Sequence, residues 1–565
     1  MKVPCWLWLG GVGMAGLLTA GLGGDLAIAQ TPPPQFPELP PLPDRLPPPS
    51  PEILVPPLDP PAQPDDPSDA VGEILVREIQ LLGNTVFSGE ELAPIIEAYE
   101  GRSLVFEDLI NLRTEITDLY VANGYTTSGA FIPPQDVSDG VVQVQVVEGR
   151  LDRLSLEGVS RLSEGYIRRR IGRAAQPPLS LPQLEQALQL LQQDPAITSV
   201  RAELVAGRAP GLSELRLNVT EASPVEGGLG LANRNSPNVG SIRPSAQLEF
   251  HSPLGIGDSL RGEFALTDGV REGRIEYQIP INAENTRLSF LYKRGRSRVV
   301  QRPFDVLGIR STEENWEFGI SHPLWETPND QFRLSLSLGI ERSRTFISDN
   351  DPFSFSDGPQ QGRSNLTVLR FTQEWSSRSP AEVVAARSQL SLGLDAFNAT
   401  RNDDDPDGRF FAWLGQFQWV RSLSPDTLLV ARVASQLSAD SLLPISQFGL
   451  GGPDTVRGYL QNQRVGDSGI IASLEFRYPL IQDPRGWGTL QIAPFIDVGT
   501  VWNLGGDREI PNPQTLVGTG LGLRWDLANN FSATLDWGIP LVGVGDRGNS
   551  LQGNGIYFSI EYNLF

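Results

Sequence analysis

An arginine in a glycine-rich segment and an acid further along are the residues most able to do chemistry in this 565-residue chain. The arginine belongs to the tetrad Val456-Arg457-Gly458-Tyr459, and the acid to Phe495-Ile496-Asp497-Val498-Gly499. A guanidinium can bind a carboxylate through two parallel hydrogen bonds, and Gly458 allows a tight turn that projects the arginine. We predict that Arg457 pairs with Asp497, with Glu475 as the second choice of partner.

Four strands near the C-terminus are expected to place charged side chains on one shared face. Because successive strand residues point to opposite faces, Leu474 and Phe476 lie on one face and Glu475 on the other. The same alternation gives the whole charged set, which is Glu475, Arg477, Asp497, Arg524 and Asp536. A soluble sandwich would turn its apolar face inward, so the pattern favours a barrel with an apolar outer wall and a charged lumen. We therefore expect the loop between Gln436 and Gly469 to carry Arg457 into that lumen.

The C-terminal region, residues 223 to 565, alternates between candidate strands and polar turns. About sixteen strands of ~10 residues would fit an outer-membrane barrel, whose strand number is even. The candidates lie near residues 225, 244, 258, 274, 286, 314, 332, 366, 388, 411, 427, 469, 488, 517, 531 and 555. Nine of the eleven tryptophans lie in this region, as aromatic girdles at the two membrane surfaces require.

The N-terminal region has the composition of an export signal and a spacer. A signal peptide is predicted over residues 1 to 29. It has a positive charge at Lys2, an apolar run from Trp6 to Ala20 and a small-residue cleavage site at Ala27-Ile28-Ala29. Residues 30 to 73 are rich in proline, which lacks an amide donor, so we expect a linker with neither helix nor sheet. Cys5 is the only cysteine, which excludes disulfides and cysteine-bound zinc from the mature chain.

Two α/β units with the same element order are expected between the linker and the barrel. In residues 74 to 149 we predict a strand at 74–82, a helix opened by a Ser88–Glu91 capping box and closed by Gly101, a helix at 106–123, and strands at 128–132 and 141–147. Residues 150 to 222 repeat this order, with elements at 151–159, 164–171, 182–193, 197–205 and 212–219. Two such units of similar length indicate an internal repeat.

Motifs that mimic enzyme or metal sites do not support either function. The run Gly466-Asp467-Ser468-Gly469 resembles a serine-protease nucleophile motif, but the chain has only two histidines, in unsuitable contexts. Residues 403 to 408 resemble the start of a calcium loop, but Leu414 stands where the bidentate Glu is needed. The formal net charge of −22 argues against a nucleic-acid partner. We expect no catalytic residue, no metal site and no cofactor.

Several motifs together resemble one superfamily of outer-membrane proteins. Residues 76 to 87 and the element order of the two α/β units resemble POTRA domains. Four motifs in the barrel region resemble those of the superfamily of BamA and two-partner secretion transporters. They are the Val-Arg-Gly-Tyr tetrad, the Phe-x-Asp-x-Gly strand, residues 520–524 and residues 536–540. Residues 233–235 through 251–258 are similar to the first barrel hairpin of the ShlB/FhaC/HecB hemolysin secretion/activation branch.

This resemblance implies an all-β transmembrane barrel of about sixteen antiparallel strands preceded by two α/β POTRA domains. It implies an outer-membrane location with the POTRA domains in the periplasm. There they would bind an unfolded exoprotein, expected to be β-helical, by β-augmentation, and the exoprotein would then cross the barrel. The barrel would contact outer-membrane lipid and would need barrel-assembly machinery for insertion. No chemical reaction is part of this activity.

Three other functions remain open from the sequence. A BamA-like insertase usually carries more POTRA units, and a passive porin needs neither POTRA units nor the arginine loop. For a hydrolase, the chain lacks a credible nucleophile with its base.

Two features depart from the family pattern. The proline tract cannot supply the N-terminal helix that often plugs the pore, and Phe565 falls on the opposite parity from Ile556, Phe558, Ile560, Tyr562 and Leu564.

Overall fold

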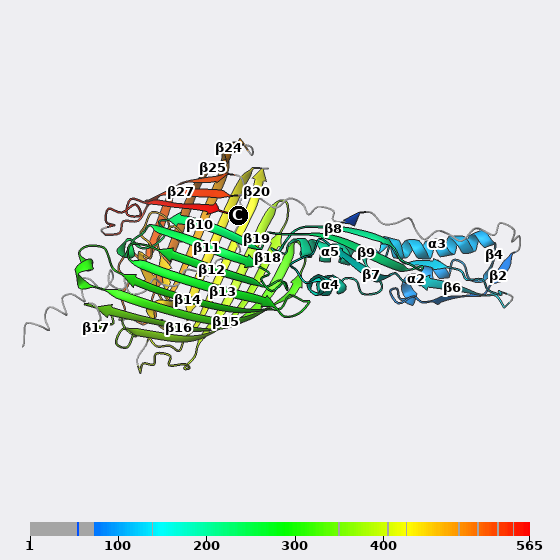
Figure 1. Cartoon of the computed structure of the whole chain (residues 1–565), viewed down its shortest axis with the longest axis horizontal. Coiled ribbons are helices and arrows are strands. Elements are labelled where there is room, and N and C mark those ends of the chain that lie inside the picture. The colour runs from blue at the N-terminus through cyan, green and yellow to red at the C-terminus, as the bar shows by residue number, and fades with distance from the viewer. Residues whose placement is uncertain are drawn as a thin grey trace, which may run out of the picture. The chain divides into compact units, whose positions relative to one another are not determined.

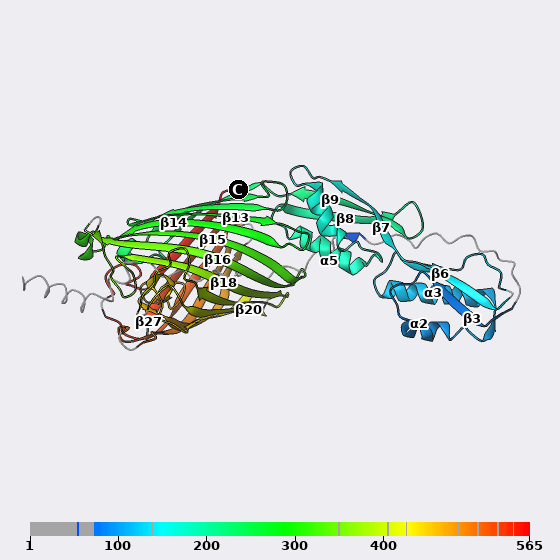
Figure 2. The ribbon, with the colours of Figure 1, turned by 90° about the horizontal axis from the view of Figure 1, so that it is seen from below.

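The structure is a computed structural model that describes residues 54–55, 73–137, 139–348, 351–403, 406–424, 426–483, 486–505, 508–527, 530–545 and 547–565. These residues form two compact units (Figures 1 and 2). The described residues up to 223, together with 254–257, form one unit, and residues 224–253 with 258–565 form the other. No helix in the described ranges is long and apolar enough to cross a membrane. The expected signal peptide and most of the expected linker lie outside the described residues.

The first α/β domain contains two helices and two small sheets. Its elements are β2 (Ile74–Val76), β3 (Glu78–Leu82), α2 (Gly89–Ile96), β4 (Arg102–Leu104), α3 (Phe106–Ala122), β5 (Gly129–Phe131) and β6 (Val141–Val147). The strands pair in the orders β3-β6-β5 and β2-β4. The buried side chains of α3, Leu109, Leu112, Ile116 and Tyr120, lie in one apolar core with Val142, Val144 and Val146 of β6.

The first helix confirms one prediction and corrects another. Ser88 and Glu91 form the expected capping box. The prediction that Gly101 closes this helix is wrong, because α2 ends at Ile96 and has Glu97 as its C-cap. Gly101 instead has a positive φ of 75° and turns the chain into β4, a strand that the sequence pattern did not predict.

The second α/β domain repeats the element order around a core of its own. It contains β7 (Arg150–Glu157), α4 (Glu164–Gly172), α5 (Leu181–Gln192), β8 (Ile197–Ala206) and β9 (Leu212–Glu221). A short strand β1 (Leu54–Val55) extends the sheet to the order β1-β8-β9-β7 and pairs with β8 in parallel. The expectation that the proline-rich region forms no sheet is therefore wrong here. Leu54 and Val55 are not prolines and retain the backbone N–H that a ladder needs.

The two α/β domains close the turn before their first helix in the same way. In the first domain Glu148 accepts hydrogen bonds from the backbone N–H groups of Thr85 and Val86. In the second, Glu221 accepts them from Ser160, Arg161 and Leu162. Burial acts to raise the pKa of Glu221, but these backbone hydrogen bonds and one from the Ser160 hydroxyl bring it below its ordinary value.

The second unit is a closed antiparallel barrel (Figure 1). Its strands in the described residues are β10 (Val225–Ala232), β11 (Arg243–His251), β12 (Ser259–Leu266), β13 (Val270–Pro280), β14 (Arg287–Arg298), β15 (Arg310–Glu326), β16 (Asp330–Ile347), β18 (Arg363–Arg378), β19 (Glu382–Gly393), β20 (Phe411–Ser424), β21 (Thr427–Ser438), β24 (Ser468–Asp483), β25 (Gly488–Trp502), β26 (Thr515–Leu527), β27 (Phe531–Pro540) and β28 (Ile556–Asn563). The two-residue β17 (Asp351–Pro352) only adds to the edge of β16, which pairs directly with β18. The prediction of sixteen strands is confirmed, although β15 and β16, at 17 and 18 residues, are longer than expected.

The barrel closes where its first strand meets its last. Five residue pairs join β10 to β28, from Gly228 opposite Asn563 to Ala232 opposite Ser559. Phe565 lies beyond the end of β28, so strand parity does not govern it. Its ring lies close enough to Gly227 of β10 that a Cβ atom there would be 2.9 Å from the ring Cζ. The terminal aromatic residue therefore lies at this seam.

Candidate functional site

The segment between β21 and β24 is a folded loop, which we call the lumen loop and define as residues 439–467. It contains the one-turn helix η3 (Pro444–Ser446) and a short antiparallel ribbon of β22 (Phe448–Leu450) and β23 (Arg464–Gly466). Its tip carries the tetrad of Val456 through Tyr459. Because that tetrad is buried against side chains from the inner faces of β24 to β27, the loop lies inside the barrel.

Arg457 binds Asp497 of β25 through both ends of its guanidinium. The Nε atom donates to Oδ2 at 2.8 Å and Nη2 donates to Oδ1 at 2.9 Å. The backbone N–H of Arg457 also donates to Oδ2, at 3.1 Å. Asp497 is only 1% exposed, so solvent screens this bidentate pair little.

The other four predicted lumen charges belong to the same cluster of ion pairs. Arg457 Nη1 lies 2.7 Å from Glu475 of β24 and 3.3 Å from Asp536 of β27. Arg524 donates one hydrogen bond to Asp536 and one to Glu475, at 2.7 and 2.8 Å, and Arg477 donates to Glu475 at 2.9 Å. Three arginines thus meet three carboxylates, and all six side chains are buried. This mutual pairing is what makes so many buried charges tolerable.

An aromatic ring supports the guanidinium from one side. The Cζ atom of Arg457 lies 3.4 Å from the ring centroid of Phe495, two residues before Asp497 on β25. Such a cation–π contact fixes the plane of the guanidinium in addition to the ion pairs. The strand alternation already places Phe495 on the inner face, but it does not show that the ring meets Arg457.

Two strand glycines make room for the backbone of the tetrad. A Cβ atom at Gly518 of β26 would overlap the carbonyl oxygen of Arg457, and one at Gly538 of β27 would overlap the amide nitrogen of Gly458. Gly458 itself has a φ of 102°, a conformation that other residues rarely adopt. Sequence reasoning missed the roles of Gly518 and Gly538. The available signal was glycine at inward positions of strand interiors, where another backbone approaches closely.

The two tyrosines of the site hold the loop by hydrogen bonds to its backbone and to the wall. Tyr557 of β28 accepts from the N–H of Gly458 at 2.8 Å and donates to the carbonyl of Tyr459 at 2.6 Å. The hydroxyl of Tyr459 lies 2.8 Å from the carbonyl of Val517 and 2.9 Å from that of Val542. Val456 packs with β22 in a separate apolar cluster.

A polar clasp links the lumen loop to the barrel seam. The side chain of Asn233, just after β10, accepts from the N–H of Phe558 and donates to the carbonyl of Ile556, so it adds two bonds between β10 and β28. Gln552 donates to the carbonyl of Asn233 and accepts from the N–H of Gln461 in the lumen loop. Asn233 and Gln552 are both fully buried. A substitution at either residue therefore affects the loop and the seam together.

Asp467, the acid in the Gly466–Gly469 run that resembles a protease motif, has a structural role. Asp467 is fully buried and accepts hydrogen bonds from the backbone N–H groups of Leu442 and Leu504. It also accepts from the side chains of Gln447 and Arg508. Asp467 therefore joins the lumen loop to the loop between β25 and β26.

Comparison with known proteins gives the family. The profile of the family "Haemolysin secretion/activation protein ShlB/FhaC/HecB" matches residues 211–525, and that of the "POTRA domain, ShlB-type" matches residues 74–149. The chain is 25% identical over 476 residues to the outer membrane transporter CdiB of Escherichia coli O6:K15:H31, covering 83% of this chain and 79% of that protein. It is 22% identical over 421 residues to the heme/hemopexin transporter protein HuxB of Haemophilus influenzae strain 86-028NP, covering 72% of each.

A solved structure has the same fold. CdiB from Escherichia coli superposes with a TM-score of 0.67 at 21% identity, covering 90% of this chain and 94% of that one. The family profile alone spans more than half of the 565 residues. The chain therefore belongs to the ShlB/FhaC/HecB haemolysin secretion/activation family of outer-membrane transporters, in which the POTRA domains lie in the periplasm.

Proposed function

We propose that this transporter recognises one unfolded exoprotein with its POTRA domains and secretes it through its barrel. The observation that carries the proposal is the set of ion pairs around Arg457, which holds a folded loop inside the barrel. A passive solute pore has no need of such a loop or of POTRA domains. A lumen loop that is held only by non-covalent contacts would suit a channel that opens for a particular chain.

The sheets of the two POTRA domains differ in how open their edges are. In the first domain Glu100 accepts from the N–H of Ile79 on β3, and Thr117 accepts from the N–H of Ala130 on β5, so side chains occupy both edges in part. In the second domain β1 covers only two of the ten residues of β8. We infer that the rest of the β8 edge is where an extended exoprotein segment adds as a further strand.

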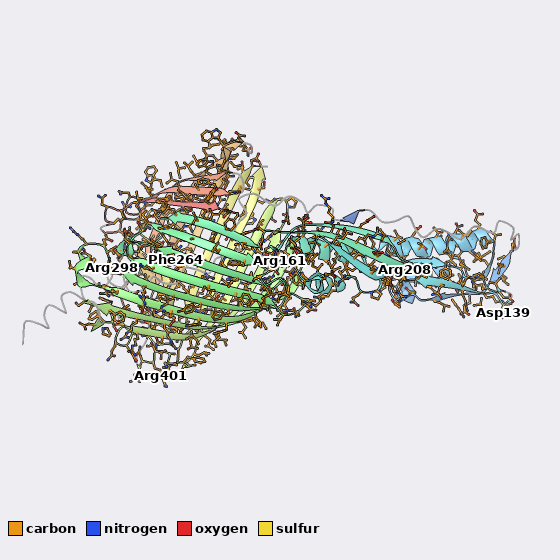
Figure 3. The ribbon with its side chains drawn as sticks, in the orientation of Figure 1. Asp139, Arg161, Arg208, Phe264, Arg298 and Arg401 are labelled. Carbon is orange, nitrogen blue, oxygen red and sulfur yellow. The ribbon has the colours of Figure 1, made fainter. Side chains whose placement is uncertain are left out.

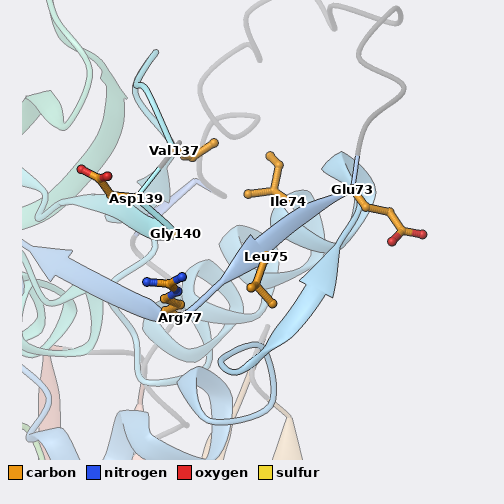
Figure 4. A pocket seen from close by; sticks show the side chains of 7 residues that line it. All are labelled: Glu73, Ile74, Leu75, Arg77, Val137, Asp139 and Gly140. Atoms are coloured by element: carbon orange, nitrogen blue, oxygen red, sulfur yellow. The ribbon is translucent and has the colours of Figure 1, made fainter.

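A pocket in the first POTRA domain offers a second contact for an extended segment (Figure 4). It has a volume of about 320 Å³ and lies beside β2. Ile74, Leu75 and Val137 give it apolar walls. Arg77 supplies one positive charge to the lining, and Glu73 and Asp139 supply two negative charges. One apolar side chain flanked by polar neighbours would suit this lining.

A secretion experiment tests the proposal. Deletion of the gene should leave one exoprotein in the periplasm and remove it from the medium, and the wild-type gene should restore its export. Reduced amounts of many outer-membrane proteins would point instead to the BamA-like insertase. An unchanged set of secreted proteins, with altered uptake of small solutes, would point to a porin. The expected β-helical fold of the exoprotein can be examined on the protein whose export is lost.

A further inference from the structure

Eight arginines form a band on the outer wall of the barrel, which we call the arginine belt. They are Arg271 of β13, Arg294, Arg296 and Arg298 of β14, Arg310 of β15, Arg342 and Arg344 of β16, and Arg363 of β18. The band is unexpected in a chain with a formal net charge of −22. The outward positions of the same strand segments carry one acid, Glu314.

Strand alternation places the belt on the lipid side of the wall. On β14 the arginines at 294, 296 and 298 share a face with Leu288, which is exposed. Lys293, between them in sequence, points the other way and pairs with Glu272 and Glu313. On β16, Arg342 and Arg344 share the face of the exposed Leu336.

The belt lies at the extracellular end of the barrel. The chain enters β10 at Val225 from the periplasmic POTRA domains, so β10 runs outward and each antiparallel neighbour reverses direction. The ends of β14 and β16 and the starts of β13, β15 and β18 therefore lie at the extracellular rim. Figure 3 shows Arg298 at the rim end of the wall, with Phe264 of β12 also labelled on this wall.

Six of the eight belt arginines stand opposite another belt arginine, and the other two, Arg294 and Arg342, stand opposite Glu314. Arg271 stands opposite Arg296, Arg298 opposite Arg310, and Arg344 opposite Arg363 in the strand registers. Like charges directly opposite each other in a sheet are destabilising. Among the described residues no carboxylate lies within 4.0 Å of the guanidinium of Arg271, Arg296, Arg298, Arg342 or Arg363. Two of these like-charge pairs, Arg271 with Arg296 and Arg344 with Arg363, have no carboxylate within 4.0 Å in the described residues, which indicates that anions from outside the chain neutralise them.

The depth of the belt matches the lipid headgroups. The rings of Tyr292 and Trp316 lie 4.1 Å apart, and those of Phe290 and Phe318 lie 5.2 Å apart, on the same outer face. Aromatic side chains of this kind mark the border between hydrocarbon and headgroups in barrels. Arg294 is the next outward residue after Tyr292 on β14, so the belt begins where the hydrocarbon ends.

We propose that the arginine belt binds the phosphate groups of the glycolipid that forms the outer leaflet of the outer membrane. A guanidinium matches a phosphate with two parallel hydrogen bonds and stays charged at any physiological pH. Phosphates seated between the facing arginines would turn each like-charge pair into an attractive cluster. Wall strands β13 to β18 would then be the side of the barrel that is held by surrounding lipid.

The test is the thermal unfolding of the full chain in a non-ionic detergent, followed by tryptophan fluorescence during titration with diphosphoryl lipid A. The wild type should unfold at a higher temperature as lipid A is added. The variant Arg294→Gln/Arg296→Gln/Arg298→Gln should need at least about tenfold more lipid A for the same shift. The matching Arg→Lys triple variant should respond between the two. An Arg150→Gln/Arg201→Gln/Arg208→Gln variant, which removes three exposed charges from the second POTRA domain, should behave as the wild type.

Three results would overturn the proposal. They are an unchanged lipid A response in the triple glutamine variant, an equal response of the wild type to dephosphorylated lipid A, and an equal response to inorganic pyrophosphate. The last result would mean that free phosphate, not lipid, is the ligand. Should the triple variant fail to assemble, Arg296→Gln and Arg342→Gln alone serve the same comparison, because neither guanidinium contacts an acid in the described residues.

Discussion

The guanidinium of Arg457 lies between the ring of Phe495, 3.4 Å from its centroid, and the carboxylate of Asp497, two residues later on the same strand. One strand thus supplies both an aromatic surface and a bidentate anion for a side chain from a distant loop. The two contacts restrain different motions, since the ring fixes the plane of the guanidinium and the carboxylate fixes its rotation within that plane.

Arg457→Ala should sharply reduce secretion while the barrel still assembles. The substitution leaves three carboxylates with fewer partners, and breaking a buried ion pair in this way costs about 3–5 kcal/mol. This cost should fall on the state in which the lumen loop lies inside the barrel, because Asp497, Glu475 and Asp536 all contact the Arg457 side chain there. Export of the exoprotein reports the function, and heat-modifiable migration on gels reports assembly.

The matched control is Arg401→Ala. Arg401 pairs with Asp395 at 3.0 Å, but its side chain is 65% exposed, so its loss should change little. Secretion that is unchanged in Arg457→Ala would refute the role of the ion-pair set.

Gly538→Ala should release the lumen loop. An added methyl group would overlap the amide nitrogen of Gly458. The methyl carbon is fixed to the backbone of β27 and the nitrogen belongs to the backbone of the loop, so no side-chain rotation can relieve the overlap. The readout is maleimide labelling of Thr455→Cys, a buried loop position, in a chain whose only other cysteine is Cys5. We expect labelling to accelerate several-fold relative to Thr455→Cys alone. Gly262→Ala on β12, where a Cβ atom would have no neighbour within 4 Å, should leave the rate unchanged, and equal rates in all three proteins would contradict the steric argument.

Strand parity explains why so much of this site could be predicted from the sequence. The direction of each side chain along a strand is a local property, so the inward set of Glu475, Asp497 and Asp536 follows from the apolar residues between them. The sixteen strands follow from the same local pattern. Parity narrows the candidate partners of Arg457 to these inward acids, and all three contact it.

Contacts that depend on how the barrel closes could not be predicted in this way. Asn233 and Gln552 are 319 residues apart, and only the meeting of β10 and β28 brings them together. The close approach of Gly518 to Arg457 depends on the path of the lumen loop across the wall. Phe565 departs from parity because its strand has already ended.

Gln552→Ala should weaken the barrel seam and the lumen loop together. It removes the hydrogen bonds to the carbonyl of Asn233, which is buried, and to the N–H of Gln461, which is partly buried. A buried polar group that loses its partner costs about 1–3 kcal/mol. We expect a lower unfolding temperature in the gel-shift assay and faster labelling of Thr455→Cys. Asn554→Ala is the control, since Asn554 is exposed and its side chain bonds only within its own turn. A lower unfolding temperature without faster labelling would mean that the clasp serves the seam alone.

Glu221 should make the second α/β domain sensitive to acid. Its pKa is lowered in the folded domain, so its contribution is present above the unfolded value of about 4.5 and is lost as pH falls through the folded pKa. Glu221→Gln keeps the shape but not the charge that accepts the N–H groups of Ser160, Arg161 and Leu162. Hydrogen exchange of these three amides in the full chain should be faster in the variant at pH 7. The difference should shrink as pH falls below the folded pKa, where the wild-type carboxyl is also neutral. Equal exchange at pH 7, with the Glu148 turn of the first domain as internal reference, would show that the charge does not hold this turn.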